Sequence, residues 1–471
     1  MSQQTSRLNT NFLFSLTLIL TTIILAVILS YIDAIPKRGI IGFSIFYPIL
    51  PIIAILLYSN VINLRQMLGT FLIILVLASG VRLPFLGQVL YPITFYAIYA
   101  IGMGFIILWH SILKNSYKEL QDSKIIIIPF ALLIIGALLS IPFVKDTKNL
   151  IIWFYYALVN ISCALVFVYS FQTYDDIMKI GIPTYTIVAT LFISTVFIKP
   201  PEYTYSGMIQ RYAGIFATPN APGVFGAFSL FLALAAIFYV KKRIIKIFYG
   251  IVIIVYLIAI IRTASRNAFF GSIVGFWVFQ ALLIYRYRRK RLLFIFSTLF
   301  TGAITLLLAY IAIKHSKTLL LRVSVSTKGD LSILTRFFFW NSVLHYIINN
   351  PIHFIIGVGP IQFYHYPFSL NYAYPHNVVV DFLFSFGIFG LLALGVLLFY
   401  QLKAAFKVIK KVGETNINTY IVKIAVISSL VVFWITSLFD EIPWKVKQVE
   451  IIYLIVPYLI TTLKILTHKN D

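Results

Sequence analysis

Long apolar runs, repeated along the chain, restrict most strongly how this sequence can fold. About fourteen such runs, many of them about 18–22 residues long, are separated by short charged breaks. A helix of about 20 apolar residues crosses the hydrocarbon core of a bilayer. Only 11% of the residues are charged, against roughly 25% in soluble domains. The sequence therefore predicts an all-α, polytopic integral membrane protein with one transmembrane domain, residues 1–471, and about fourteen transmembrane helices.

The first apolar run lacks a small-residue cleavage site, so we expect it to be retained as a span. Residues 248–285 are predicted to form two helices, because one continuous helix would be too long to cross once and would bury Arg262 and Arg266. The expected spans are residues 12–32, 40–62, 68–82, 88–110, 125–141, 151–171, 181–198, 221–240, 248–262, 266–285, 292–313, 377–402, 418–438 and 449–466.

The net charge of +24 follows from basic residues in short loops between spans. They lie at Lys241–Arg243, Arg286–Arg291 and Lys403–Lys411, and a cytoplasmic excess of lysine and arginine is typical of membrane proteins. This bias places the N-terminus inside, and we expect no nucleic-acid partner. Segments 199–220, 262–266, 314–376 and 439–448 are then expected outside. Cys163 is the only cysteine, which excludes a disulfide within the chain.

The interval 314–376 is the one long polar stretch, and it holds five of the seven histidines. A loop of this length is usually functional or disordered, and its aromatic content argues against disorder. Within it, 335–349 is predicted to be a short amphipathic helix on the membrane surface, and Gly357 and Gly359 predict a tight turn. The apolar stripe expected on that helix is Phe337, Trp340, Leu344, Ile347 and Ile348. We expect this external loop to cap an active site.

Three spans that enter from the outside begin beside a cationic or titratable residue. Arg211 precedes a span with Asn220 as the expected N-cap, Arg266 opens the next inward span, and His376 precedes Asn377, a second expected cap. Helix N-termini carry partial positive charge and free N–H groups, which favours phosphates. The pattern predicts an outward-facing anion site. Taken singly, Arg211 and Arg266 are equally compatible with snorkelling to lipid phosphates.

The candidate chemistry rests on an imidazole and arginines. A neutral His376 would act as a general base, although a lone histidine is more often an ordinary loop residue. Arg336 and Trp340 are four residues apart and share a helix face, which suits either a phosphate or sugar clamp or a membrane anchor. Asp381 either orients His376 or is a buried polar residue. Since no paired carboxylates accompany these residues, we expect no metal and no cofactor.

Four segments resemble signatures of the O-antigen polymerase and ligase superfamily of bacterial envelope glycosyltransferases. Arg211–Asn220 resembles an arginine, glycine and Pro-Asn signature before a span, and Thr263–Ala268 is similar to a Ser-Arg segment, with Ala264 where glycine is common. Arg336–Trp340, followed by Gly357–Gly359 and His376–Asn377, looks like the large external loop. These motifs cover roughly residues 205–400, and the first half of the chain is similar only in being apolar.

The resemblance implies a GT-C-like membrane fold in the bacterial inner membrane, with the active site facing the periplasm or exterior. It implies a metal-independent, inverting transfer of a glycan from undecaprenyl diphosphate to a glycan acceptor. Arg211 and Arg336, with Arg266, would bind the donor diphosphate, and His376 would accept the proton of the attacking hydroxyl. Asn220, Trp340, Asn377 and Asp381 are expected supporting residues. Membrane lipids and a chain-length regulator are further partners that it allows.

Members of this superfamily differ in acceptor. A polymerase extends repeat units on the lipid carrier into a surface polysaccharide such as O-antigen or capsule, and a ligase moves finished polymer onto lipid A core. The expected span number and the lack of an added soluble domain favour the polymerase. A transporter of lipid-linked sugars remains the alternative outside enzymology, although it should show two similar halves and substrate residues near the bilayer midplane.

Overall fold

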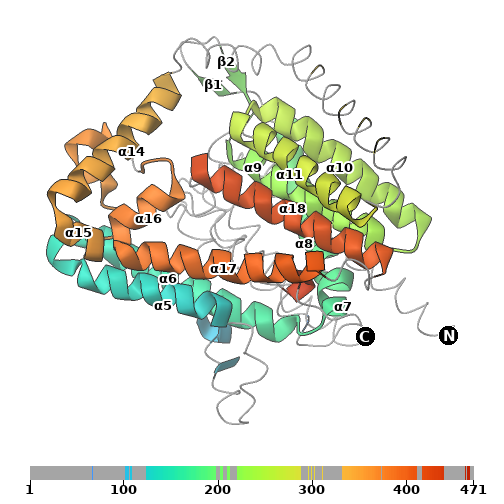
Figure 1. Cartoon of the computed structure of the whole chain (residues 1–471), viewed down its shortest axis with the longest axis horizontal. Helices are drawn as coiled ribbons and strands as arrows, with labels where there is room; N and C mark the ends of the chain where they lie inside the picture. The colour runs from blue at the N-terminus through green and yellow to red at the C-terminus, as the bar shows by residue number, and fades with distance from the viewer. Residues whose placement is uncertain are drawn as a thin grey trace, which may run out of the picture.

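The computed structural model describes residues 124–197, 202–204, 209–212, 220–287, 331–372, 374–410 and 416–439, with residues 66, 101–104, 107–108, 295, 299, 302, 310, 462 and 464–466. These residues are almost entirely helical (Figure 1), which confirms the expected helical fold. One two-stranded antiparallel ribbon, β1 (Glu202–Thr204) with β2 (Ile209–Arg211), was not expected from the sequence. The predicted spans at 12–32, 40–62 and 68–82, and most of those at 88–110, 292–313 and 449–466, lie outside the described residues.

The helices follow in the order printed in Figure 1, with short 3₁₀ turns at residues 141–143, 195–197, 363–365 and 367–369 and a π turn at 177–181. They are α5 (Lys124–Leu139), α6 (Thr147–Ser170), α7 (Tyr174–Asp176), α8 (Ile182–Ser194), α9 (Asn220–Tyr239), α10 (Arg243–Thr263), α11 (Arg266–Arg286), α14 (Leu331–Asn349), α15 (Pro351–Ile356), α16 (Val378–Phe386), α17 (Ile388–Lys410) and α18 (Ile417–Phe439).

Among the described residues, six helices are long and apolar enough to cross a membrane: α6, α9, α10, α11, α17 and α18. Helix α5 is shorter but equally apolar. Helices α10 and α11 are separate, as predicted, because Ala264 adopts a left-handed conformation with φ 49° and Ser265 caps α11. The described part is therefore a multi-pass membrane fold, and the count of fourteen spans stays a prediction.

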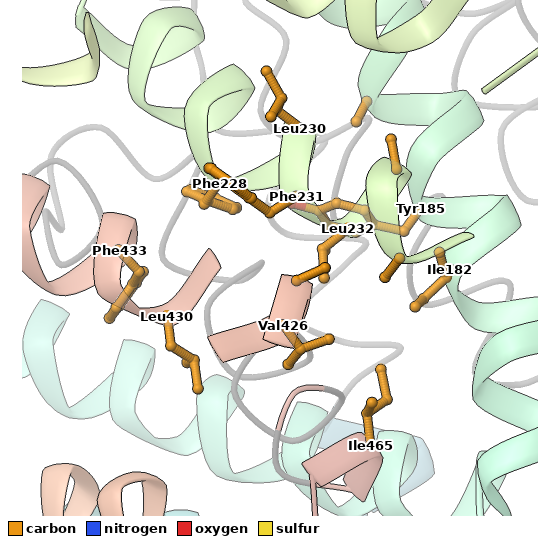
Figure 2. Close-up of a cluster of buried hydrophobic side chains, with 14 of the residues drawn as sticks. Ile182, Tyr185, Phe228, Leu230, Phe231, Leu232, Val426, Leu430, Phe433 and Ile465 are labelled. Atoms are coloured by element: carbon orange, nitrogen blue, oxygen red, sulfur yellow. The ribbon is translucent and has the colours of Figure 1, made fainter. Parts of the chain in front are cut away.

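Helix α9 lies at the centre of the structure. It packs against α8, α10, α11 and α18, and small residues along it allow the close approach of these neighbours. Figure 2 shows the resulting core, in which Phe228 and Phe231 of α9 lie near Leu430 and Phe433 of α18. The rings of Phe228 and Phe433 meet edge to face, with centroids 6.3 Å apart. Aromatic packing of this kind makes α9 and α18 the rigid support for the loops at their ends.

The outer helices present apolar residues away from the core. On α10 these residues recur at helical spacing on one side, which is typical of a face in contact with lipid. They are Ile244, Ile247, Ile251, Ile254 and Ile258. Helix α17 packs against α5, and α5 against α6, so these three form a second group beside the α9-centred helices (Figure 1).

The span predicted at 377–402 is wrong at its start. Gly387 has φ 61° and ends α16, so the membrane-length helix α17 begins at Ile388. A Cβ on Gly387 would collide with the backbone carbonyl of Ile355. The chain therefore bends sharply between α16 and α17, and α16 also packs with α14 and α15. We call α14, α15 and α16, with their connections, the cap.

One end of the helices gathers the loops that were predicted on the cytoplasmic side. Gln66 donates a 2.6 Å hydrogen bond to Asp176, and Tyr239 donates one of 3.0 Å to Asp175. Lys464, near the C-terminus, donates a 2.6 Å hydrogen bond to the carbonyl of Phe171 at the end of α6. We call this the basic end and the opposite end, which carries the cap, the site end. The grouping agrees with the predicted alternation of spans.

Candidate functional site

Two of the three helix N-termini predicted to converge lie against one another at the site end. Gly223, in the first turn of α9, is so close to the α10–α11 turn that an added Cβ would lie 2.7 Å from Thr263 Oγ1 and 2.9 Å from Ser265 Cβ. Ser265 Oγ accepts a hydrogen bond from the N–H of Ala268, as an N-cap does. Helix α9 begins at Asn220 and α11 at Arg266, so both predicted starts are placed together.

A β ribbon brings the first predicted arginine toward the same turn. Its register aligns Arg211 with Glu202, and Tyr212 follows directly. The Tyr212 ring lies under the guanidinium of Arg262, with the guanidinium carbon 4.1 Å from the ring centroid. Arg262 lies in the last turn of α10, four residues before Arg266. The ribbon therefore ends beside the α10–α11 turn.

The third N-terminus, that of α16, carries His376 on a constrained backbone. His376 has φ 60°, a left-handed conformation that is rare outside glycine and asparagine. Asn377 is the N-cap of α16, as predicted, and its Oδ1 accepts hydrogen bonds from the N–H groups of Val379 and Val380. Asp381 lies in the first turn of this helix. Because His376 is left-handed, the chain turns sharply just before Asn377, the N-cap residue of α16.

Helix α14 holds the segment that leads to His376. Trp340 Nε1 donates a 2.9 Å hydrogen bond to the carbonyl of Pro375. The Phe339 ring stacks on the imidazole of His376, with centroids 6.5 Å apart and planes at 23°, and Tyr372 meets it edge to face at 5.7 Å. Arg336 lies one turn before Trp340 on the same helix. Arg336, Trp340 and His376, predicted to act together, thus belong to one packed unit.

The C-terminal part of α18 links this unit to the α10–α11 turn. Phe439 of α18 contacts Trp340, with ring centroids 6.5 Å apart. Three residues earlier on α18, the carbonyl of Thr436 accepts a 2.8 Å hydrogen bond from Asn267, the second residue of α11. The predicted residues therefore form two groups, one around His376 and one around Arg266, and α18 contacts both.

The buried face of α14 differs from the predicted apolar stripe. Phe339, Val343 and Ile347 are buried against the rest of the cap, whereas Phe337, Leu344 and Ile348 are exposed. The helix is thus apolar on two faces. The exposed face is the one free to lie on a membrane surface, as predicted for this helix.

The Gly357–Gly359 segment forms the expected tight turn and also pairs with α16. The N–H groups of Val358 and Gly359 donate to the carbonyls of Phe384 and Ser385, at 2.9 and 3.0 Å. Gly357 has φ 73°, and a Cβ there would collide with the backbone of Ser385. Only glycine allows the two backbones to lie this close.

His353, one of the histidines of the 314–376 interval, is buried. Its Nδ1 lies 3.0 Å from the carbonyl oxygen of Gly357, and its ring stacks on Tyr346 with centroids 5.4 Å apart. Phe143, from the α5–α6 connection, meets it edge to face at 4.7 Å. His353 therefore belongs to the packing of the cap.

Gln362, which belongs to no sequence motif, joins the cap to the α5–α6 connection. Its Oε1 accepts from the N–H groups of Lys145 and Asp146 at 3.0 and 2.9 Å, and its Nε2 donates to the carbonyl of Asp146 at 3.0 Å. The side chain is fully buried. Beside it, the Lys145 ammonium lies 3.9 Å from the centroid of the Tyr366 ring.

Together, the fold and this site define a multi-pass helical membrane protein whose cap is anchored at one end of its helices. Residues 251–395 match the family model described as O-Antigen ligase. This match confirms the resemblance to the O-antigen polymerase and ligase superfamily. It runs from within α10 into α17 and encloses Arg266, Arg336 and His376, whereas Arg211 precedes it. A comparison with curated proteins found no match.

Proposed function

We propose that the protein is a membrane glycosyltransferase that polymerises undecaprenyl-diphosphate-linked repeat units into a surface polysaccharide, O-antigen or capsule. The observation that carries this proposal is the O-antigen ligase match itself, since it encloses both the α10–α11 turn and the cap with His376. Transfer from a lipid-linked diphosphate requires cations for the leaving group and a base for the acceptor. Both kinds of residue are present at the site end, arginine in the group around Arg266 and a histidine in the group around His376.

The donor diphosphate would be bound by Arg211, Arg266 and Arg336. Guanidinium groups match phosphate geometry through paired N–H donors and keep their charge at every physiological pH. The N-termini of α9 and α11, which meet at Gly223, add partial positive charge in the same place. These fixed charges stabilise the negative charge that develops on the departing diphosphate, so they lower the barrier without a metal ion.

The chemical step would be an in-line substitution at the anomeric carbon of the donor glycan. The acceptor hydroxyl forms the new C–O bond on one face, and the bond from carbon to the diphosphate oxygen breaks on the other, which inverts the anomeric configuration. The electron pair leaves with the diphosphate. His376 takes the proton of the hydroxyl as general base, and its position between Phe339 and Tyr372 fixes the plane of the imidazole.

The site end would face the periplasm or the exterior of a bacterial inner membrane. The short loops at the opposite end are rich in lysine and arginine, which favours the cytoplasm for that end. A lipid-linked donor would then reach the arginines from the outer leaflet. The exposed apolar face of α14, with Phe337, Leu344 and Ile348, would lie on that leaflet.

A ligase that transfers finished polymer to lipid A core is the second candidate, and the description of the matched family favours it. Both activities use the same donor and differ only in acceptor. The deciding experiment offers purified protein a lipid-linked oligosaccharide donor with repeat-unit lipid and lipid A core side by side, in EDTA.

We expect elongation of the repeat-unit lipid and release of undecaprenyl diphosphate. Transfer to lipid A core alone would replace the polymerase by the ligase. A strict requirement for a divalent metal would overturn the metal-independent mechanism, and movement of intact donor across vesicles without glycan transfer would replace the enzyme by a transporter.

A further inference from the structure

Arg262 lies against two aromatic rings at the site end. Its guanidinium carbon lies 4.1 Å from the centroid of Tyr212 and 5.3 Å from that of Phe197. The rings come from separate segments, Phe197 from the turn after α8 and Tyr212 from the end of the β ribbon. Cation–π contacts to two rings fix the plane of the guanidinium.

The same guanidinium is partly withdrawn from solvent without a charged partner in the described residues. Its Nε is inaccessible and meets no hydrogen-bond acceptor in the described part of the chain. Nor does any aspartate or glutamate of that part form an ion pair with it. An arginine is always charged, and burying its charge without an anion is costly. This combination indicates a place for an anionic ligand.

The surroundings of Arg262 specify the kind of anion. Along the chain it lies four residues before Arg266, and the ring beneath it, Tyr212, follows Arg211. Arg262 therefore lies one turn of chain before Arg266, at the end of α10 next to the N-terminus of α11, and its ring partner directly follows Arg211. A planar fork of N–H donors, positioned by two rings, can pair with the oxygens of a phosphate through parallel hydrogen bonds.

We propose that Arg262 is a further phosphate-binding residue of the site, with Tyr212 and Phe197 holding its guanidinium in position. The ligand is the phosphate group of an anionic lipid: the lipid-linked diphosphate or a phospholipid headgroup. In the first case the inference rests on the proposed function and adds a fourth cation to the donor site. In the second it defines a headgroup site beside the donor.

The test uses full-length wild type, Arg262→Gln and Arg262→Lys in phosphatidylcholine nanodiscs. One arm measures the affinity for undecaprenyl diphosphate, and the other measures the rise in Tm on adding phosphatidylglycerol. We expect Arg262→Gln to reduce the response in one arm, the affinity for undecaprenyl diphosphate or the rise in Tm with phosphatidylglycerol, by about tenfold or more. Arg262→Lys should restore only part of that response, because lysine keeps the charge without the fork of N–H donors. Arg243→Gln, at the basic end of the same helix, is the matched control and should equal wild type.

The outcomes separate this inference from the proposed function. Unchanged behaviour of a folded Arg262→Gln in both arms overturns the inference, even where wild type elongates glycans. An Arg262-dependent response to phosphatidylglycerol in a protein that transfers no glycan supports the inference and refutes the function. If Arg262→Gln does not fold, Arg262→Lys serves as the test. Wild-type values of Arg262→Lys in both arms, the affinity and the rise in Tm, would contradict a phosphate contact through the guanidinium fork.

Discussion

Trp340 Nε1 and the carbonyl oxygen of Pro375 lie 2.9 Å apart and are joined by a hydrogen bond. Pro375 is the residue before His376, so the indole fixes the chain at the entry to the proposed base. Phe339, the preceding residue of α14, stacks on the imidazole itself. Because Arg336 is on the same helix, α14 sets the relative position of the arginine proposed to bind phosphate and the proposed base.

Trp340→Phe tests this arrangement, because it keeps an aromatic ring and removes only the N–H donor. The Pro375 carbonyl then loses its partner, at a cost of about 1–3 kcal/mol. We expect turnover to fall roughly 5- to 100-fold, with donor affinity much less affected. The measurement is steady-state elongation kinetics, with Trp277→Phe, an exposed tryptophan of α11, as control. Equal kinetics in both variants would contradict the role of the hydrogen bond.

His376→Asn removes the imidazole and suits the backbone, because asparagine tolerates the left-handed conformation that His376 adopts with φ 60°. If His376 is the general base, turnover should fall about 10²- to 10⁴-fold while Tm and donor binding stay close to wild type. His345→Asn, at an exposed position of α14, should change nothing. Near-normal turnover of His376→Asn would show that another group takes the proton.

Arg336→Ala should weaken donor binding as well as turnover, since a cation that contacts the diphosphate acts in both the ground state and the transition state. We expect the affinity for undecaprenyl diphosphate to drop by about tenfold or more, and the loss to be the same with and without EDTA. Lys148→Ala removes an exposed cation in the first turn of α6 at the site end and serves as control. A variant that binds donor normally but turns over slowly would move Arg336 out of the donor site.

Local rules predicted the parts of the site that depend on a few neighbouring residues. Asn377 caps α16, as predicted, because a short polar side chain can accept from N–H groups two or three residues ahead. The turn at Gly357–Gly359 follows from glycine itself. The basic loops likewise predicted which helix ends lie on the same side, because lysine and arginine are frequent at the cytoplasmic ends of spans.

Long-range contacts could not be predicted in this way. Gln362 and Asp146 are 216 residues apart, and an isolated glutamine carries no signal that it will bond backbone groups of a distant turn. Arg262 helped to predict the break between α10 and α11, but its contacts with Tyr212 and Phe197 could not be predicted, because these rings come from other segments. The break at Gly387 was missed since one glycine within an apolar run is compatible with a continuous helix.

Gly387→Ala should disrupt the junction of the cap and α17. The residue has φ 61°, and a Cβ would collide with the carbonyl of Ile355, so the backbones of α15 and α16 must separate. We expect a loss of more than about 3 kcal/mol in stability, seen as a lower Tm or poor recovery of folded protein. Gly395→Ala, in the middle of α17 with open space around its Cα, should be neutral or slightly stabilising. Similar behaviour of the two variants would contradict the bent junction.

Gln362→Glu should make the attachment of the cap sensitive to pH. The amide now accepts from two N–H groups and donates to the carbonyls of Asp146 and Pro360. A glutamate can donate only when protonated, and burial disfavours its charged form. The variant should therefore be closest to wild type at acidic pH, and its deficit in stability should grow as the pH rises, because the folded state opposes ionisation of the glutamate.

Wild type, measured in parallel, is the control for the nearby pair of His365 Nε2 and Asp146 Oδ2, which are 3.6 Å apart. Gln362→Leu cannot titrate, so its deficit should not depend on pH. The readout is protection of the cap from proteolysis between about pH 5 and 8, and a deficit of Gln362→Glu that is the same at both limits would show that the Gln362 amide does not hold the cap as described.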